Sequence, residues 1–310
     1  MHYIKLTVKT PRNRTPTKLF MDKNLEDLKK YLASSEENMS AYGKRHILNS
    51  DYHNLEEGMN SGTLVKLSKI RLIKYYLSII PQLLIFKSVM FKNSFIKKYK
   101  LICAEHKRQF NLELIIHAIV LEKLDNKNLL NGNICTIGDG KANFVNGVIH
   151  NKNINKIYSV NLPQALIQDY LVLTKYKIIE PNLIKVVNEK KDLLDQEAKI
   201  FLVPAANKIL MENKNINLFV NMFSFQEMPL SETHGYIEVA KKNSAYLYSL
   251  NRDEKAMYDG TVIRYQNYGL KKDSEVLFEE EAKFVEKYYN AKFPFIHTRE
   301  DKIFNTLVKF

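Results

Sequence analysis

The sequence has few features of a secreted or metal-binding protein. It contains only two cysteines, Cys103 and Cys135, in 310 residues, and no C-x-x-C pair. Two cysteines are too few for a disulfide framework, so a reducing cytoplasm is the expected location. The first residues carry no apolar run of the kind found in secretory signals. No H-x-x-x-H or H-E-x-x-H motif or carboxylate cluster indicates a metal site, and we expect no bound metal.

Long hydrophobic runs are missing as well. The most apolar stretch, Tyr75 to Phe86, contains Pro81 and is flanked by Lys74 and Lys87. A membrane span needs about 20 apolar residues, so no transmembrane segment is predicted. We expect a buried pair of helices bent at Pro81. The alternative is a surface-seeking amphipathic segment in peripheral contact with a membrane.

Acidic residues are outnumbered by basic ones, 34 to 47, which gives a formal charge of +13. Such an excess is compatible with nucleic-acid or anionic-lipid partners. The lysines are scattered along the whole chain, however, whereas nucleic-acid-binding proteins gather them on one face. The composition therefore argues against a nucleic-acid partner, and it leaves the oligomeric state open.

The chain divides into two regions by its apolar pattern. Residues 1–130 are predicted to form a mainly helical region, with helices in Leu25 to Leu32, Leu64 to Tyr99 (interrupted) and Leu112 to Leu124, and loops in Ser34 to Gly62. Residues 131–310 alternate apolar strand-like runs with helical ones. That alternation predicts an α/β domain with a parallel-rich sheet covered by helices on both faces.

The predicted elements of the second region are the following. Candidate strands are Ile134 to Ile137, Lys156 to Val160, Ile184 to Asn188, Ile200 to Val203, Leu218 to Met222, Ala245 to Leu250 and Ile303 to Phe310. Candidate helices are Gly140 to Ile149, Pro163 to Tyr176, Ala205 to Glu212, Ser231 to Lys242 and Glu279 to Tyr289. A terminal antiparallel hairpin is expected within Phe293 to Phe310, around the turn-like Thr298 to Asp301.

The stretch Asn133 to Asn143, reading N-I-C-T-I-G-D-G-K-A-N, carries the strongest functional signal. An apolar strand ends in Gly138-Asp139-Gly140 and a helix-compatible segment follows. Such a turn brings backbone N–H groups close to a bound ligand, as nucleotide-like cofactors require. The dinucleotide fingerprint G-x-G-x-x-G would need glycine where Asn143 stands, so the pattern indicates a cofactor other than NAD.

Polar or small residues also follow the other candidate strands. In open α/β sheets, ligands bind outside the carboxyl ends of the strands, near the switch point. The segments that follow strands there are Asn161-Leu162-Pro163, Pro204-Ala205-Ala206-Asn207, Ser224-Phe225-Gln226-Glu227-Met228-Pro229 and Asn251-Arg252. The small residues after Pro204 would let an adenine ring lie flat.

Together, I-G-D-G, V-N-L-P, N-M-F-S-F-Q-E-M-P and Y-S-L-N-R resemble motifs of the sugar O-methyltransferases within the class I S-adenosylmethionine-dependent methyltransferases. The resemblance covers about residues 100–310. It implies a Rossmann-like, seven-stranded sheet with a reversed last hairpin. It also implies S-adenosyl-L-methionine as cofactor and a sugar hydroxyl of a glycan, lipid-linked sugar or nucleotide-sugar as acceptor, in polysaccharide biosynthesis. The helical region before residue 131 would then form a lid and much of the acceptor pocket, with Met257 to Lys272 contributing to specificity.

The resemblance also implies a set of cofactor contacts. Gly138 and Gly140 would approach the methionine portion, with Asp139 facing its amino group or a water. Asn161 stands where methyltransferases usually carry an acidic residue for the ribose hydroxyls, and Lys141 replaces a small residue of the common E/D-x-G-x-G pattern. The remaining predicted contacts are Leu162, Pro204, Ala205, Asn221 and Met222.

A sugar hydroxyl is a poor nucleophile at neutral pH, so a general base is expected. Glu227 and His234 are the candidates, because both follow the S-F-Q-E-M-P motif closely. Glu227 has an alternative role as a cap of the helix that begins near Ser231. Asn251 and Arg252 are the predicted acceptor contacts, although Arg252 has a surface ion pair with a neighbouring acidic residue as its alternative. His117, inside an apolar helix, is predicted to be structural.

Two other functions stay open at this stage. A nucleic-acid methyltransferase would use the positive charge, but no D/N-P-P-Y/F/W motif follows the fourth sheet strand, where Asn221-Met222-Phe223-Ser224 stands. A non-catalytic binding protein on a degenerate methyltransferase fold would account for the departures at Lys141 and Asn161.

Overall fold

The computed structural model describes residues 23–35, 68–257, 260–289, 293 and 295–310. The predicted loop segment Ser34 to Gly62 therefore lies almost entirely outside the described residues, and so does the predicted start of a helix at Leu64.

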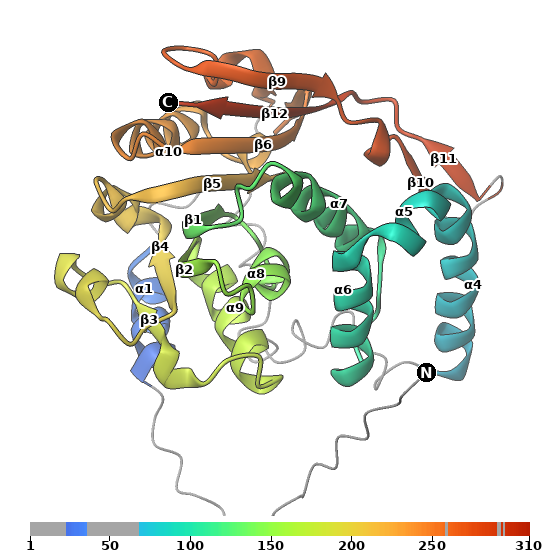
Figure 1. Ribbon diagram of the computed structural model, residues 1–310, viewed down its shortest axis with the longest axis horizontal. Helices are drawn as coiled ribbons and strands as arrows, with labels where there is room; N and C mark the ends of the chain where they lie inside the picture. Colours follow the sequence, from blue (N-terminus) through green and yellow to red (C-terminus); the bar gives the residue numbers. More distant parts are fainter. Residues whose placement is uncertain (1–22, 36–67, 258–259, 290–292, 294) are drawn as a thin grey trace, which may run out of the picture.

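An eight-stranded sheet forms the centre of the molecule (Figure 1). In spatial order its strands are β3 (Ile184–Val186), β4 (Ile200–Pro204), β2 (Ile154–Asn161), β1 (Gly132–Ile137), β5 (Ile216–Met222), β6 (Tyr246–Arg252), β12 (Ile303–Lys309) and β9 (Glu275–Glu281). The first six strands are parallel, and β12 is antiparallel to both of its neighbours. The predicted α/β fold, with a Rossmann-like parallel-rich sheet and an antiparallel strand pair at its C-terminal end, is confirmed.

The helices of the described residues cover both faces of this sheet. They are α1 (Lys23–Ser35), α4 (Lys69–Ile85), α5 (Lys87–Lys92), α6 (Ser94–Glu105), α7 (Leu112–Asn126), α8 (Asn143–Val148), α9 (Pro163–Lys175) and α10 (Leu230–Lys242), with the 3₁₀ turns η3 (Pro181–Leu183), η4 (Lys190–Leu194), η5 (Ala205–Met211), η6 (Phe225–Glu227), η7 (Tyr265–Tyr268) and η8 (Lys283–Val285).

Successive strand residues belong to different cores, as the two-residue period of a strand requires. In β4, Ile200 and Leu202 pack on the side of α7, α8 and α9, whereas Phe201 and Val203 pack on the side of α10. All four side chains are buried. The near-continuous apolar strands are thus explained by burial on both faces.

The helix predicted for Glu279 to Tyr289 is wrong. Those residues belong to β9, η8 and the short strand β10 (Lys287–Tyr289). The glutamate-rich sequence favours a helix locally, but strand β12 offers a free row of backbone hydrogen-bonding groups, and Phe278 pairs with Leu307 across it. Tertiary pairing overrides local propensity here. Strand β9 raises the sheet from the seven predicted strands to eight.

The antiparallel partner of β12 also differs from the predicted one. The segments on the two sides of the Thr298 to Asp301 turn do not pair with each other. The first of them, β11 (Ile296–Thr298), pairs with β10, and the second is β12, which pairs with β9 and β6.

The N-terminal helices lie in two separate places (Figure 1). Helix α1 packs beside α9 and β3, where the Asn24 side chain donates to the Ile184 carbonyl at 2.9 Å. Helices α4, α5 and α6 lie at the other end of the molecule. The described part of residues 1–130 is therefore not one compact region, because α1 lies beside β3 whereas α4, α5 and α6 lie away from it, with α6 against α7.

The expectation of a buried helix pair bent at Pro81 is wrong. Helix α4 continues through Pro81, and the chain breaks only at Phe86 and Asn93. Asn93 starts the next helix because its side-chain oxygen accepts the Ile96 N–H at 3.0 Å. Much of α4 is exposed to solvent. Within the described ranges, no helix combines the length and apolar character needed to cross a bilayer.

Candidate functional site

The predicted cofactor turn lies at the carboxyl end of β1, next to the ends of β2 and β5. The Gly138 N–H donates to the Val160 carbonyl at 2.9 Å, which joins the ends of β1 and β2. Four residues of the turn are left-handed: Gly138 (φ 72°), Gly140 (φ 55°), Lys141 (φ 59°) and Ala142 (φ 51°). Helix α8 begins only after this turn, three residues later than predicted from Gly140. Left-handed lysine and alanine store strain, which is common at ligand-binding turns.

The two glycines of the turn have different roles. A Cβ added to Gly138 would lie 2.4 Å from the Ser224 Cβ and Oγ. Gly138 therefore allows the β1 and β5 turns to pack against each other. A Cβ added to Gly140 would meet no atom within 4 Å. The open space that a close-lying ligand needs is thus beside Gly140.

The Asp139 carboxylate bonds to backbone groups of the protein itself. Its side chain is fully buried, and its carboxylate accepts the N–H groups of Phe144 at 2.7 Å and Val145 at 3.1 Å. It therefore holds the first turn of α8. The contact of Asp139 with the amino group of a ligand or with a water stays a prediction.

His117 contacts the Asp139 carboxylate and is buried, in line with its predicted structural role. Its Nε2 lies 3.5 Å from Asp139 Oδ1, and its Nδ1 lies 2.9 Å from the Glu113 carbonyl oxygen. Both nitrogens face acceptors, an arrangement that favours the charged imidazolium, in which both nitrogens carry hydrogen. Burial alone would lower the pKa of His117, but the hydrogen bond and charge of Asp139 outweigh burial, and the pKa is raised.

Asp169 of α9 is a second buried support of the turn that the sequence did not reveal. Its carboxylate accepts the Ala142 N–H at 2.7 Å and the Ser159 hydroxyl at 3.4 Å. Burial, and next the Asp139 carboxylate, raise the pKa of Asp169 well above its usual range. A single acid among the apolar residues of the predicted helix Pro163 to Tyr176 was the available signal.

Replacing Asp169 by asparagine is expected to flatten the dependence of stability on pH. A carboxyl with a raised pKa binds more protons in the folded than in the unfolded chain. Its contribution is therefore present below the unfolded pKa of about 3.9 and is lost as the pH rises through the folded value. Asparagine keeps an oxygen for the Ala142 N–H but does not titrate. His117, with its raised pKa, adds a decline of the same sign in both proteins, so the difference between their urea-unfolding curves across pH isolates Asp169. Parallel curves would contradict the prediction.

The S-F-Q-E-M-P motif builds a buried network of amides at the ends of β5 and β6. The Asn221 side chain donates to the Ile137 carbonyl at 3.2 Å and bonds the Ser224 hydroxyl. Its oxygen accepts the Asn251 amide at 2.8 Å. The Gln226 oxygen accepts the Arg252 N–H at 2.9 Å. Asn221 and Asn251 are fully buried, and their side chains bond to other groups of the protein. They therefore hold the strand ends together rather than presenting free groups to a ligand.

Glu227 is the acidic residue of the motif. Its carboxylate forms an ion pair with Lys255, which a hairpin of β7 (Glu254–Ala256) and β8 (Val262–Arg264) brings over η6. The second oxygen, Oε2, is buried without a hydrogen-bond partner among the described residues, and so is the Tyr268 hydroxyl. Burial, and next the Glu227 charge, raise the pKa of Tyr268. The proposed capping role is wrong, because α10 begins at Leu230 after Pro229 without a side-chain cap.

His234 and Arg252 lie outside this buried cluster. His234 is exposed on α10, and its Nε2 lies 3.0 Å from the Asn267 carbonyl oxygen. Arg252 is half-exposed and pairs with Asp301 at 2.9 Å rather than with its sequence neighbours. The structure thus separates the two predicted base candidates: only Glu227 has a buried, unpartnered oxygen.

The remaining predicted contacts lie along the same edge. The Asn161 side-chain oxygen accepts the Leu162 N–H at 2.9 Å, where α9 begins. Pro204 is buried at the end of β4, and Ala205 is half-buried where the chain turns into η5, a 3₁₀ turn instead of the predicted α-helix. Met222 is half-buried at the end of β5.

A cavity of ≈430 Å³ opens beside the end of β6. Its lining combines aromatic, acidic and basic side chains, from Asp253, Tyr265, Gln266, Gly269, Leu270, Lys271, Lys272, Glu279 and Phe304. The Tyr265 ring contacts the Tyr268 ring edge-on, with 5.7 Å between centroids. Glu227 is not among the residues that line this cavity. Residues of the glycine turn do not line it.

The chain is similar in fold to solved methyltransferases, at low identity and low TM-score. The methyltransferase domain of bacterial CtHen1-CN matches with 10% identity and a TM-score of 0.40, over 64% of this chain and 100% of that one. An S-adenosylmethionine-dependent methyltransferase from Clostridium acetobutylicum matches with 11% identity and a TM-score of 0.38, over 63% and 90% of the two chains. One from Leishmania major matches with 11% identity and a TM-score of 0.38, over 63% and 73%. At TM-scores this low, the likeness carries no argument about reaction or substrate.

No protein-family model matches the chain, and no curated protein matches it.

Proposed function

We propose that this protein is an S-adenosyl-L-methionine-dependent O-methyltransferase that acts on a hydroxyl group of a sugar, within a glycan, a lipid-linked sugar or a nucleotide-sugar. One observation carries the proposal most directly. The left-handed turn after β1 leaves open space beside Gly140, at the carboxyl edge of a parallel sheet and next to its switch point between β1 and β5.

The residues of this edge fit the cofactor in part. Gly140 would let the main chain approach the methionine portion, and Pro204 and Ala205 would border the adenine. Asn161 offers an amide where a carboxylate is usual, so its hydrogen bond to a ribose hydroxyl would lack charge assistance. When bound, S-adenosylmethionine supplies an activated methyl group, and the protein's task is to position the acceptor, which removes about 7–11 kcal/mol of a barrier.

Glu227 is the group that we assign to the acceptor proton. Its Oε2 is buried and has no hydrogen-bond partner among the described residues, while its other oxygen is held by Lys255. A carboxylate fixed through one oxygen can accept a hydroxyl proton with the other. General-base assistance of this kind contributes about 10²–10⁴-fold in rate.

The cavity beside β6 suits a part of a sugar acceptor other than the reacting hydroxyl, because neither Glu227 nor the glycine turn lines it. Tyr265 and Phe304 stack with 4.8 Å between their ring centroids, and the surrounding lysine, glutamine and carboxylate groups are donors and acceptors for hydroxyls. The cavity is lined largely by the segment Met257 to Lys272, which we expected to determine the acceptor.

Calorimetric titration of the full-length protein with S-adenosylmethionine tests the proposal. We expect one binding site per chain, and competition by the demethylated product S-adenosylhomocysteine. Transfer of a labelled methyl group to sugar acceptors, located by mass spectrometry, would then define the substrate. Absence of binding to either compound would contradict the proposal and favour a non-catalytic role. Salt-sensitive binding to RNA or duplex DNA would instead favour a nucleic-acid substrate.

A further inference from the structure

Helix α4 carries an apolar stripe that no described residue covers. The exposed side chains recur at intervals of three and four, so they lie on one face of the helix. They are Ile70 (68% exposed), Ile73 (60%), Leu77 (57%), Ile80 (54%) and Leu84 (68%). An apolar surface of this extent marks an interaction site rather than ordinary surface variation.

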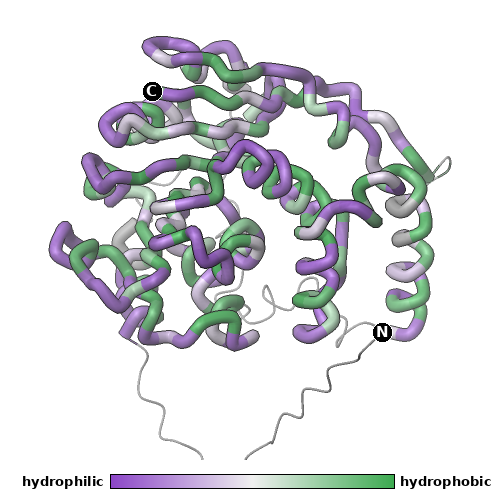
Figure 2. The backbone as a smooth tube through the Cα atoms, viewed as in Figure 1, coloured by the Kyte–Doolittle hydropathy of each residue, from purple (hydrophilic) through white to green (hydrophobic). Residues whose placement is uncertain are grey.

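The opposite face of α4 packs against the rest of the protein. The stripe therefore faces outward. The Tyr75 hydroxyl accepts the Phe110 N–H at 2.9 Å, and Ile85 packs against the main core. Helix α4 also contacts α5 and β10. Figure 2 shows α4 mostly in the colour of hydrophobic residues, at the outer edge of the molecule.

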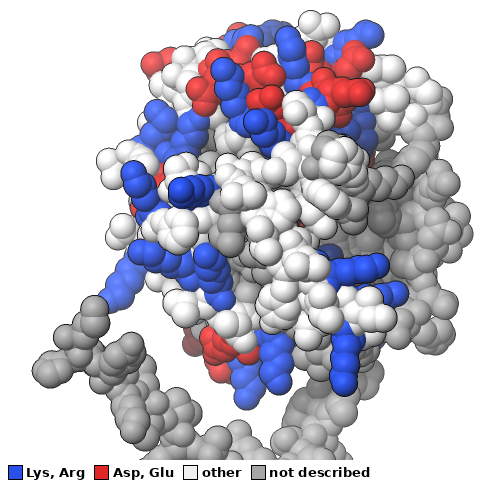
Figure 3. Space-filling model, turned by 90° about the vertical axis from the view of Figure 1, so that its right-hand side faces the viewer, with Lys and Arg blue, Asp and Glu red and all other residues white. Residues whose placement is uncertain are grey.

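The chain segment that carries the stripe is basic and contains no acidic residue. Residues 69–104 include eight basic residues and neither aspartate nor glutamate; the basic residues are Lys69, Arg71, Lys74, Lys87, Lys92, Lys97, Lys98 and Lys100. On this side of the molecule, Figure 3 shows a broad uncharged area flanked by basic side chains, with most acidic side chains gathered at the top. An apolar helix face bordered by lysine and arginine is typical of helices that lie in the surface of an anionic membrane.

We propose that α4 binds the surface of a membrane containing anionic lipids, with the stripe Ile70–Ile73–Leu77–Ile80–Leu84 in the acyl boundary and the exposed basic residues of α4, Lys69, Arg71 and Lys74, at the headgroups. The 17 residues of α4 are enough for this mode of binding, because a helix that lies in the membrane surface does not have to cross the bilayer. A second copy of the chain fits this face less well, because a symmetric contact would bring the same basic residues together without acidic partners.

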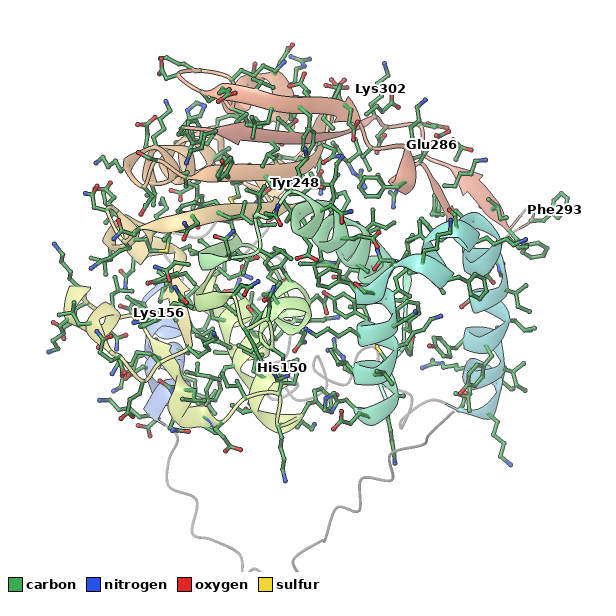
Figure 4. The ribbon with its side chains drawn as sticks, in the orientation of Figure 1. His150, Lys156, Tyr248, Glu286, Phe293 and Lys302 are labelled. Carbon is green, nitrogen blue, oxygen red and sulfur yellow. The ribbon has the colours of Figure 1, made fainter. Side chains whose placement is uncertain are left out.

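The hairpin of β10 and β11, which contacts α4 through β10, extends this apolar surface. Phe293 is 85% exposed and points outward beyond β11 at the outer edge of the molecule, near the upper end of α4 (Figure 4). Aromatic side chains favour the membrane–water interface. Membrane binding by α4 uses no residue of the strand-end site, so it is independent of the methyl-transfer proposal.

Vesicle co-sedimentation of the full-length protein tests this inference. We expect binding to vesicles of phosphatidylcholine mixed with phosphatidylglycerol, and much weaker binding to phosphatidylcholine alone. Changing Ile73, Leu77 and Ile80 together to serine should lower the partition coefficient by about a thousandfold, since each buried aliphatic side chain contributes about tenfold. Changing Arg71 and Lys74 to glutamate should weaken binding to the anionic vesicles only.

Matched changes at Leu194 and Ile209, exposed apolar residues of η4 and η5 away from α4, serve as the control. The Leu194→Ser/Ile209→Ser protein should bind vesicles as the unchanged protein does. Circular dichroism and the urea midpoint establish that the variants are folded. Equal binding by the α4 serine variant, no binding by the unchanged protein, or a dimer that the α4 changes convert to monomer would each overturn the inference.

Discussion

The protein with alanine in place of Gly140 is expected to stay folded and to lose S-adenosylmethionine binding. The added Cβ meets no protein atom within 4 Å, so the fold bears only the left-handed backbone penalty, roughly 1 kcal/mol. A methyl group in the space that the ligand needs should lower affinity by about a hundredfold, the size of an overpacking penalty. Calorimetry measures the affinity, and urea unfolding measures the stability.

Variants at two other glycines serve as controls for this experiment. Gly260 has φ +84° and equally open surroundings, so Gly260→Ala carries the same kind of backbone penalty and should bind normally. Gly138→Val should instead destabilise the fold, because its Cβ would meet Ser224 at 2.4 Å. Wild-type affinity in Gly140→Ala would show that no ligand lies against this turn.

The second large effect is expected at Glu227. Glu227→Gln keeps the size and one oxygen of the side chain but cannot accept a proton, so turnover should fall by about 10²–10⁴-fold. The KM for S-adenosylmethionine should change little, because the carboxylate acts on the acceptor. The measurement is the rate of labelled-methyl transfer to the identified sugar.

His234→Ala is the matched comparison for this test. His234 was the other base candidate, but its ring is exposed and contacts a backbone carbonyl, so turnover should be nearly unchanged. Full activity in Glu227→Gln would remove Glu227 from the proton-transfer role, and a large loss only in His234→Ala would transfer that role to His234.

Local sequence was sufficient to predict most strands of the central sheet. Strands buried on both faces must be apolar throughout, so the runs that became β1, β2, β4, β5 and β6 stood out from their surroundings. The turns between them were visible for the same reason, since glycine, proline and polar residues interrupt those runs. Strand β9 was not visible, because its glutamates are good helix formers and only pairing with β12 makes it a strand.

For the candidate site, sequence identified the segments but not the roles of their side chains. Asp139, Asn221 and Asn251 all lie at the strand ends, as predicted. Their hydrogen-bond partners, however, come from residues up to 84 positions away, such as Ile137 for Asn221. Asp169 escaped notice because a single acid in an apolar helix does not identify its partner, the Ala142 N–H, which lies 27 positions away.

The sequence by itself determined the α/β alternation, the glycine turn after β1 and the position of Glu227 after β5, because each depends on residues close together in the chain. Only the tertiary structure decided which glycine faces open space, which carboxylate keeps an oxygen without a partner, and which side of α4 is exposed. Packing between distant segments settles these features, and periodicity or motif spacing does not encode that packing.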